Sequence, residues 1–424
     1  MVLTPGPGKW FPAHGYARRA MSAPAEPLDT PELAAFRAQV RTFLTARLEP
    51  KAPSARVAIM GAGSDDLTSG RTFLGTLAEG GMAVPRWPEA LGGMGATPQQ
   101  AEIVAEELSR CEAPDLYPFM VGIDLVGPTL MEHGTEDQKA RWLPGIRSGA
   151  EIWCQLFSEP DAGSDLANLG AKATQDGDMW HVTGSKVWSS RAHYSKWGLL
   201  IARTDPSQPK HAGMTAFALD MEQPGVTVRP LRQLNGDQHF NEVFLDNAEV
   251  PELDRIGAVG AGWRITMTTL THERASIGAG WGVIGNDQLI DHARRFGGLA
   301  DPVARDRVTA SIMDLEISRM SNLRAKVAAR TGRAAGPEGS GAKLRNSQVL
   351  SRLGNLAVDL EGTGGVTGGD DWQTLFLTGP SFGIRGGTDE IQRNIVGERV
   401  LGLPPEPRVD KDVPYSEARK GTRG

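Results

Sequence analysis

One stretch decides the fold: Gln155-Leu-Phe-Ser-Glu-Pro-Asp-Ala-Gly-Ser-Asp165, where the pattern of the chain changes. Before it, residues 31–150 place apolar side chains mostly at helical spacing, with Thr30 as an N-cap for the first helix. Residues 151–250 carry short alternating runs between Asp-Gly, Asp-Pro and Pro-Gly turns, which predict an antiparallel β domain. Residues 251–403 show helical spacing again. The order predicts an α+β fold in three parts.

Composition excludes several classes of protein. The chain has 424 residues, with 45 Lys and Arg against 51 Asp and Glu, and it contains no long basic run. A nucleic acid or an anionic membrane is therefore not the expected partner. The only cysteines, Cys111 and Cys154, cannot build a multi-disulfide scaffold or an iron–sulfur cluster, and the 8 histidines show no metal-binding spacing. No apolar run is long enough to predict a membrane span, and no metal is expected.

The two ends are expected to lie outside the folded domains. Residues 1–30 are rich in Pro, Gly and Ala and lack the apolar core of a secretory signal, so they predict a disordered extension. Either Met1 or Met21 could be the true start. Residues 404–424 contain Pro-Pro-Glu-Pro and predict an extended tail. The simplest expected location is the cytoplasm.

One motif points to a different class of enzyme. Gly280-Trp-Gly-Val-Ile-Gly285 matches the GxGxxG string of dinucleotide-binding folds. That fingerprint must follow a buried strand and open a helix, whereas this copy lies inside the helical pattern that runs from Trp263 to Arg295. We interpret its glycines as small residues that let helices approach closely. A Rossmann-type oxidoreductase is therefore disfavoured.

Three strings carry a resemblance to a known family. They are the stretch 155–165, Gly184-Ser-Lys-Val-Trp-Ser-Ser190, and Ile384-Arg-Gly-Gly-Thr-Asp-Glu-Ile-Gln-Arg393. Together with the α–β–α order, they resemble the acyl-CoA dehydrogenase family over residues 31–404. The resemblance implies an N-terminal helical domain (31–150), a middle β-barrel domain (151–250) and a C-terminal four-helix bundle (251–403).

The same resemblance implies an activity and its partners. Acyl-CoA dehydrogenases hold FAD between the β domain, the bundle and a neighbouring subunit, so a homo- or heterotetramer, or a dimer, is expected. They oxidise an acyl-CoA thioester to its trans-2-enoyl-CoA and pass the electrons to an electron-transfer flavoprotein. By this resemblance, Phe157 and Ser158 line the polar edge of the flavin, Ser190 donates to its N5, and Trp188 packs against its ring.

Further cofactor contacts follow from the C-terminal motif. Thr388 closes a glycine turn that opens a helix, where backbone can approach a pyrophosphate. Glu390 matches a position on the adenosine side of FAD, and Arg295 matches a pyrophosphate contact. The resemblance places Ser164 near the bound CoA ester.

The catalytic base needs a separate argument. Many family members place a glutamate immediately before Gly-Thr, but this chain has Gly386 there. A second branch of the family, which includes isovaleryl-CoA and long-chain acyl-CoA dehydrogenases, places the catalytic glutamate just before an arginine, on the first long helix of the bundle. Glu273 and Arg274 match that arrangement, so Glu273 is the expected base and Arg274 its support. The Gly386 N–H is expected to polarise the thioester carbonyl, with Gly387 beside the substrate.

Departures from the family pattern leave the substrate and assembly open. Arg295 lacks the glutamine that usually follows its motif, and Asp359-Leu-Glu-Gly362 replaces a Gln-x-x-Gly element. They suggest a branched, cyclic or steroid-derived acyl chain, or a heteromer in which only some subunits hold complete FAD sites. Two rivals remain: a flavin monooxygenase or oxidase on the same scaffold, and a non-catalytic partner subunit.

Overall fold

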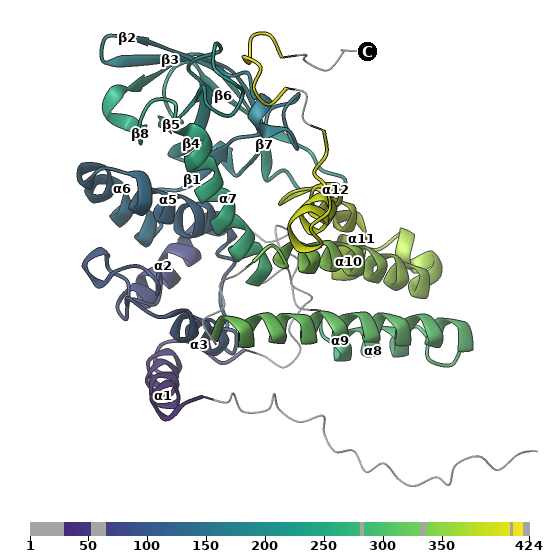
Figure 1. Cartoon of the computed structure of the whole chain (residues 1–424). Helices are drawn as coiled ribbons and strands as arrows, with labels where there is room; N and C mark the ends of the chain where they lie inside the picture. The colour runs from purple at the N-terminus through teal and green to yellow at the C-terminus, as the bar shows by residue number, and fades with distance from the viewer. Residues whose placement is uncertain (1–28, 52–64, 280–283, 331–335, 408–409, 419–424) are drawn as a thin grey trace, which may run out of the picture.

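The computed structural model describes residues 29–51, 65–279, 284–330, 336–407 and 410–418 (Figure 1). Helices precede the sheet in the chain, as the spacing of apolar residues predicts. The first begins at Pro31, with the Thr30 hydroxyl accepting from the Leu33 N–H. These helices are α1 (Pro31–Thr45), α2 (Leu67–Ala78), α3 (Pro98–Leu108), α4 (Tyr117–Met120), α5 (Gly127–His133) and α6 (Glu136–Ser148), with a π-turn at Val121–Val126.

The middle of the chain forms one eight-stranded sheet, in the order β6-β7-β3-β2-β4-β5-β8, with β1 beside β4. The strands are β1 (Trp153–Leu156), β2 (Lys172–Asp176), β3 (Met179–Ser190), β4 (Trp197–Arg203), β5 (Met214–Asp220), β6 (Val226–Leu231), β7 (Phe240–Pro251) and β8 (Arg255–Ile256). Most pairs are antiparallel, as expected. However, β4 is parallel to both β1 and β2, because the chain crosses over through the β2–β3 hairpin before it returns.

Helices return after the sheet: α7 (Gly262–Ala279), α8 (Asn286–Arg295), α9 (Pro302–Arg330), α10 (Gly339–Glu361), α11 (Asp371–Phe382) and α12 (Asp389–Ile395). The expected continuous helix from Trp263 to Arg295 is wrong. Gly285 is extended and caps α8, where its N–H bonds to the Gln288 side chain at 2.9 Å. Glycine favours such a break because it has poor helix propensity. The rest of the GxGxxG string, residues 280–283, lies outside the described residues.

Buried tryptophans join the N-terminal helices to the sheet. Trp142 on α6, Trp153 on β1 and Trp197 on β4 contact one another with ring centroids 5.5, 5.6 and 5.8 Å apart. Aromatic groups of this kind add to the free energy gained from their burial. Figure 1 shows α7 running from the sheet to the bundle helices, and α7 packs on β5 at one end and on α10 at the other. Within the described ranges, no helix has the length and hydropathy to cross a bilayer.

The C-terminal segment returns to the sheet. The N–H of Tyr415 donates to the Gln208 carbonyl oxygen at 2.9 Å, and Pro414 pairs with Pro209. The Arg203 guanidinium lies over the Tyr415 ring at 3.9 Å, and Lys210 Nζ contacts an Asp410 carboxylate oxygen at 2.7 Å. Residues 410–418, which we call the strap, are therefore docked against the β4–β5 connection.

Tyr415→Ala should release the strap, because Arg203 loses the ring that covers it and the buried ring area is lost. We expect the Tyr415 region to lose about 1.5–3 kcal/mol of local stability, which makes its amide exchange roughly 10- to 100-fold faster. Native-state hydrogen exchange measures this. Tyr415→Phe keeps the ring and should exchange nearly as slowly as the wild type. Equal exchange rates in all three proteins would show that the ring does not hold the strap.

Candidate active site

The two predicted flavin-contacting segments lie side by side. The Val187 N–H donates to the Ser158 carbonyl oxygen at 2.9 Å, and Lys186 Nζ donates to the Phe157 carbonyl oxygen at 3.1 Å. The end of β1 therefore runs along the end of β3. This contact brings Phe157 and Ser158 next to the strand that ends at Ser190.

Trp188 has a strained backbone and an exposed ring. Its φ is 61°, in the left-handed region that bulky residues rarely adopt, and a bulge interrupts the β3–β7 register between Lys186 and Ser189. The ring is 59% exposed and meets the edge of Phe240 at 5.8 Å. A large aromatic residue held this way fits a surface that receives another flat ring. The bulge therefore fits the predicted contact between Trp188 and a flavin.

Sequence reasoning missed a buried ion pair directly behind this surface. The Lys186 side chain is 0% exposed, and its Nζ contacts Glu159 Oε1 at 2.7 Å. Burial lowers the pKa of Lys186, and the Glu159 carboxylate opposes that shift. Glu159 also accepts the N–H groups of Gly170 and Ala171, at 2.7 and 2.9 Å. The pair fixes the ends of two strands and the loop that leads to β2.

Glu273 lies on α7 and faces β1. Its side chain is half-buried, and Gln155 Nε2 donates to Glu273 Oε2 at 3.4 Å. One turn earlier on the same face, the Thr269 hydroxyl bonds to that of Thr129 at 2.9 Å, which fixes the helix against the N-terminal helices. The predicted base thus contacts Gln155, which is two residues before Phe157 in the chain. Arg274 is on the same helix, but its side chain lies outside the described residues.

The glycine turn before α12 has a left-handed backbone. Gly386 and Gly387 have φ values of 65° and 85°, which side chains rarely adopt. Gln392 Nε2 donates to the carbonyl oxygens of both glycines at 3.1 and 3.3 Å, and the Thr388 hydroxyl caps α12 by accepting the Ile391 N–H. The predicted oxyanion donor and the predicted pyrophosphate turn are therefore one ordered structure.

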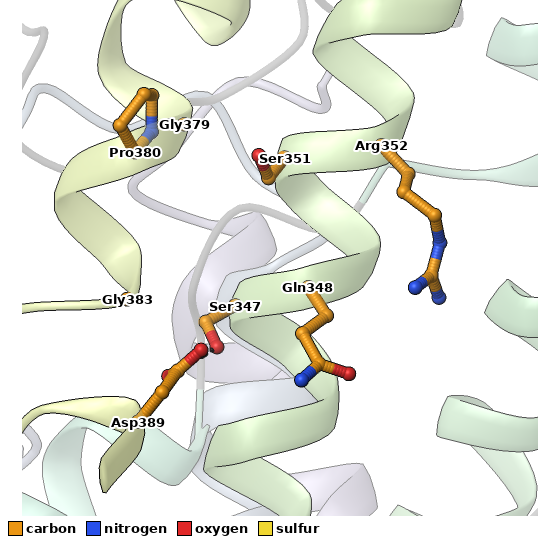
Figure 2. A pocket seen from close by; sticks show the side chains of 8 residues that line it. All are labelled: Ser347, Gln348, Ser351, Arg352, Gly379, Pro380, Gly383 and Asp389. Carbon is orange, nitrogen blue, oxygen red and sulfur yellow. Dashed lines mark hydrogen bonds between the residues drawn. The ribbon is translucent and has the colours of Figure 1, made fainter.

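Of the two acids after this turn, Asp389 is turned toward α10 and Glu390 is exposed. Asp389 Oδ1 contacts the Ser347 hydroxyl at 2.8 Å and Lys343 Nζ at 3.3 Å, both on α10. Figure 2 shows the Asp389 carboxylate beside the Ser347 hydroxyl, and both residues line a recess of about 330 Å³ between α10, α11 and α12. Glu390 is exposed and pairs with Arg393 at 3.1 Å.

Two other predicted residues, Arg295 and Ser164, are exposed. Arg295 is exposed at the end of α8, which Figure 1 places toward the far end of the bundle from the sheet. Ser164 is exposed in the loop after β1, beside Asp165, whose carboxylate contacts Lys210 Nζ at 3.0 Å. Across the described residues, no three His, Cys, Asp or Glu side chains gather as metal ligands would.

His239 lies just before β7, and sequence reasoning also missed it. It is 7% exposed, and burial is the main cause that lowers its pKa to about 4. The positive charges of Arg191, Arg385 and His193 act in the same direction, whereas Asp65 opposes them. A neutral histidine is therefore held among cationic groups near the end of β3.

Comparison with known proteins identifies the class. Family models of the acyl-CoA dehydrogenase N-terminal, middle and C-terminal domains match residues 30–150, 154–248 and 260–401. The chain therefore belongs to the acyl-CoA dehydrogenase family. This confirms the family and the three-part α+β fold that the motifs indicate, and it makes the chain a member of a family of FAD-dependent enzymes.

Individual relatives refine this class. The chain is 39% identical over 382 residues to acyl-CoA dehydrogenase IpdE1 of Mycobacterium tuberculosis, covering 88% of this chain and 98% of that protein. It also resembles the solved structure of the Tcur3481-Tcur3483 steroid ACAD, with a TM-score of 0.75, 27% identity and coverage of 89% and 99%. The ChsE4-ChsE5 complex from Mycobacterium tuberculosis is similar, with a TM-score of 0.68, 25% identity and the same coverage.

Lys186→Met should destabilise the β domain strongly, because it leaves the Glu159 carboxylate without its cation. We expect a loss of about 3–5 kcal/mol, measured by chemical unfolding. Lys139→Met is the matched control, since Lys139 pairs with the exposed Glu136 and should cost less than about 1 kcal/mol. Adding Glu159→Gln to Lys186→Met should recover part of the loss. Similar losses for the two single variants would contradict the role of the buried pair.

Acid should destabilise the wild type more than His239→Phe. The folded-state pKa of His239, about 4, lies below the unfolded value of 6.5. The contribution of neutral His239 to the free energy of unfolding is therefore complete above pH 6.5. It is lost as pH falls toward 4, by up to about 3 kcal/mol. Thermal unfolding of both proteins between pH 7.5 and 4 measures the difference. Parallel pH profiles would mean that His239 titrates normally.

Proposed function

We propose that this chain introduces a trans double bond between the α and β carbons of an acyl-CoA thioester, with Glu273 removing the α-proton. FAD, when bound, supplies the acceptor for the β-hydride. The observation that carries the proposal is the direction of the acids: Glu273 faces β1 at Gln155, whereas Asp389 and Glu390 point into the bundle and into solvent. Of these three acids, Glu273 is therefore the one that lies next to the predicted flavin surface.

The residues around the site supply three functions in this proposal. An α-proton of a thioester is weakly acidic, so the base must work together with a donor to the carbonyl oxygen. The ordered turn at Gly386 supplies a backbone N–H for that oxygen. Glu273 is half-buried, and the amide of Gln155 orients its carboxylate. The exposed ring of Trp188 and the hydroxyls of Ser158 and Ser190 suit the isoalloxazine of FAD.

We further propose a bulky, ring-containing acyl group, of the kind found in steroid degradation. The support is the similarity to a structure titled a steroid ACAD, together with the departures from the common fatty-acid pattern near Arg295 and Asp359. An electron-transfer flavoprotein is the proposed electron acceptor, as the family resemblance implies.

A second subunit is part of the proposal. α9 exposes a stripe of apolar side chains at helical spacing: Met313, Ile317, Met320, Leu323 and Val327. Contiguous exposed apolar surface of this kind marks a protein interface. Arg295 is exposed on the adjacent α8, which suits a contact with a cofactor held by a neighbouring subunit. Both solved relatives above are titled as pairs of different chains, so we propose a heteromeric assembly.

Glu273→Gln should bind FAD normally but lose substrate-dependent bleaching, because an amide cannot accept the α-proton. We expect the bleaching rate to fall by at least about 100-fold. Anaerobic stopped-flow absorbance with a panel from butyryl-CoA to steroid side-chain thioesters measures it. Glu79→Gln removes an exposed carboxylate from the N-terminal helices and should leave the rate unchanged.

The bleaching assay, an aerobic oxygen-uptake assay and the FAD content of the purified assembly together test the rival functions. Bleaching at the wild-type rate in Glu273→Gln would remove the assignment of the base. Rapid oxygen uptake during turnover would favour an oxidase or monooxygenase. A purified assembly in which this chain holds no FAD would favour a non-catalytic subunit.

A further inference from the structure

Two buried side chains near the proposed active site carry donors without acceptors. Arg191 is 2% exposed, and neither Nη1 nor Nη2 has a hydrogen-bond partner among the described residues. His239 is 7% exposed, and its Nε2 also has no hydrogen-bond partner among the residues that the structure describes. A buried polar group costs free energy unless it is hydrogen-bonded, so three such atoms in one place indicate a missing acceptor.

The rest of the Arg191 guanidinium is fully engaged. Its Nε donates to Asp65 Oδ1 at 2.7 Å, and its Cζ lies 4.3 Å from the centroid of the Tyr117 ring. With one face stacked on a ring and one edge on a carboxylate, the fork of Nη1 and Nη2 is held in a fixed orientation. A guanidinium fork matches the two oxygens of a carboxylate.

The tautomer of His239 makes its free nitrogen a donor as well. Gln233 Nε2 lies 3.0 Å from His239 Nδ1, so the glutamine amide donates to Nδ1. A neutral ring that accepts at Nδ1 carries its proton on Nε2. All three atoms are therefore donors, and the buried hydroxyl of Tyr194 near Arg191, unpartnered within the described ranges, can donate as well, so the cluster calls for an acceptor rather than a cation.

These donors are next to the reacting atoms of the proposed reaction. Arg191 directly follows Ser190, the predicted donor to flavin N5. His239 directly precedes Phe240, which pairs with Ser190 across the sheet. The Arg191 N–H donates to the His239 carbonyl oxygen at 2.6 Å, which extends the ladder by one step. Arg385 acts on His239 electrostatically and directly precedes Gly386. The cluster is thus adjacent in the chain to Ser190 and is close enough to Arg385, the residue before Gly386, to feel its charge.

We propose that Arg191 and His239 are specificity-determining residues that bind a second carboxylate on the acyl group of the substrate. This inference rests on the proposed function and names its substrate class: a CoA thioester whose acyl part carries an anionic group a few carbons from the α,β bond. The Arg191 fork binds both oxygens, and His239 Nε2 donates to one of them.

The test compares the binding of matched CoA thioesters to the FAD-loaded enzyme. Where a partner subunit copurifies with this chain, the complex is used. Mono-CoA thioesters of dicarboxylic acids with five to eight carbons are paired with unsubstituted acyl-CoAs of equal length. At the best length, the carboxylated ligand should bind wild type at least about tenfold more tightly. Arg191→Gln and His239→Phe should each reduce that preference, whereas Arg47→Gln, on an exposed arginine far from the site, should retain it.

Dissociation constants from calorimetry decide the inference, independently of turnover. FAD content is measured for every variant. If either Arg191→Gln or His239→Phe loses FAD, its loss of preference is not counted, and the variant that retains FAD decides the inference. No preference in the wild type at any length, or a preference that survives both substitutions, would overturn the inference. Failure of both ligand classes to bleach the flavin would contradict the proposed reaction instead.

Discussion

The buried contact between Lys186 and Glu159 is the constraint on which the proposed active site depends. A lysine without access to water must keep its partner, and this one is held by a carboxylate and by the carbonyl oxygen of Phe157. The end of β1 therefore cannot separate from β3. With β3 anchored there, the next two residues can adopt the bulge that presents Trp188, because the strain is offset by the fixed strand behind it.

The backbone of the glycine turn and the position of the proposed base are linked. A glutamate at position 386 would have to adopt a φ of 65°, and a side chain at position 387 would meet Gln392. The turn as built therefore suits a backbone donor better than a side-chain base. An acid on α7 fits the same arrangement, since that helix passes β1 on its way to the bundle. The left-handed backbone at Gly386 and the course of α7 past β1 together explain why the proposed base and the glycine turn are on separate elements.

Much of the fold could be predicted from the sequence, because the change from helical to alternating spacing and three separated motifs are local features. The break at Gly285 was missed, since the apolar spacing continues on both sides of it. The burial of Lys186 could not be predicted, because a lysine within Gly-Ser-Lys-Val-Trp has the pattern of a solvated strand residue. Arg191 and His239 are brought together only by the β3–β7 pairing, which no short motif encodes.

The docked strap has a consequence for the order in which the molecule is made. Lys210 and Asp410 are 200 positions apart, so the ribosome completes the sheet strands long before it adds the segment that covers them. Until then Arg203 lacks the ring that it stacks on in the finished protein. A nascent chain stalled before Tyr415 would thus carry a complete sheet with one uncovered cation. The Arg203–Tyr415 stacking can therefore form only after the strap has been added.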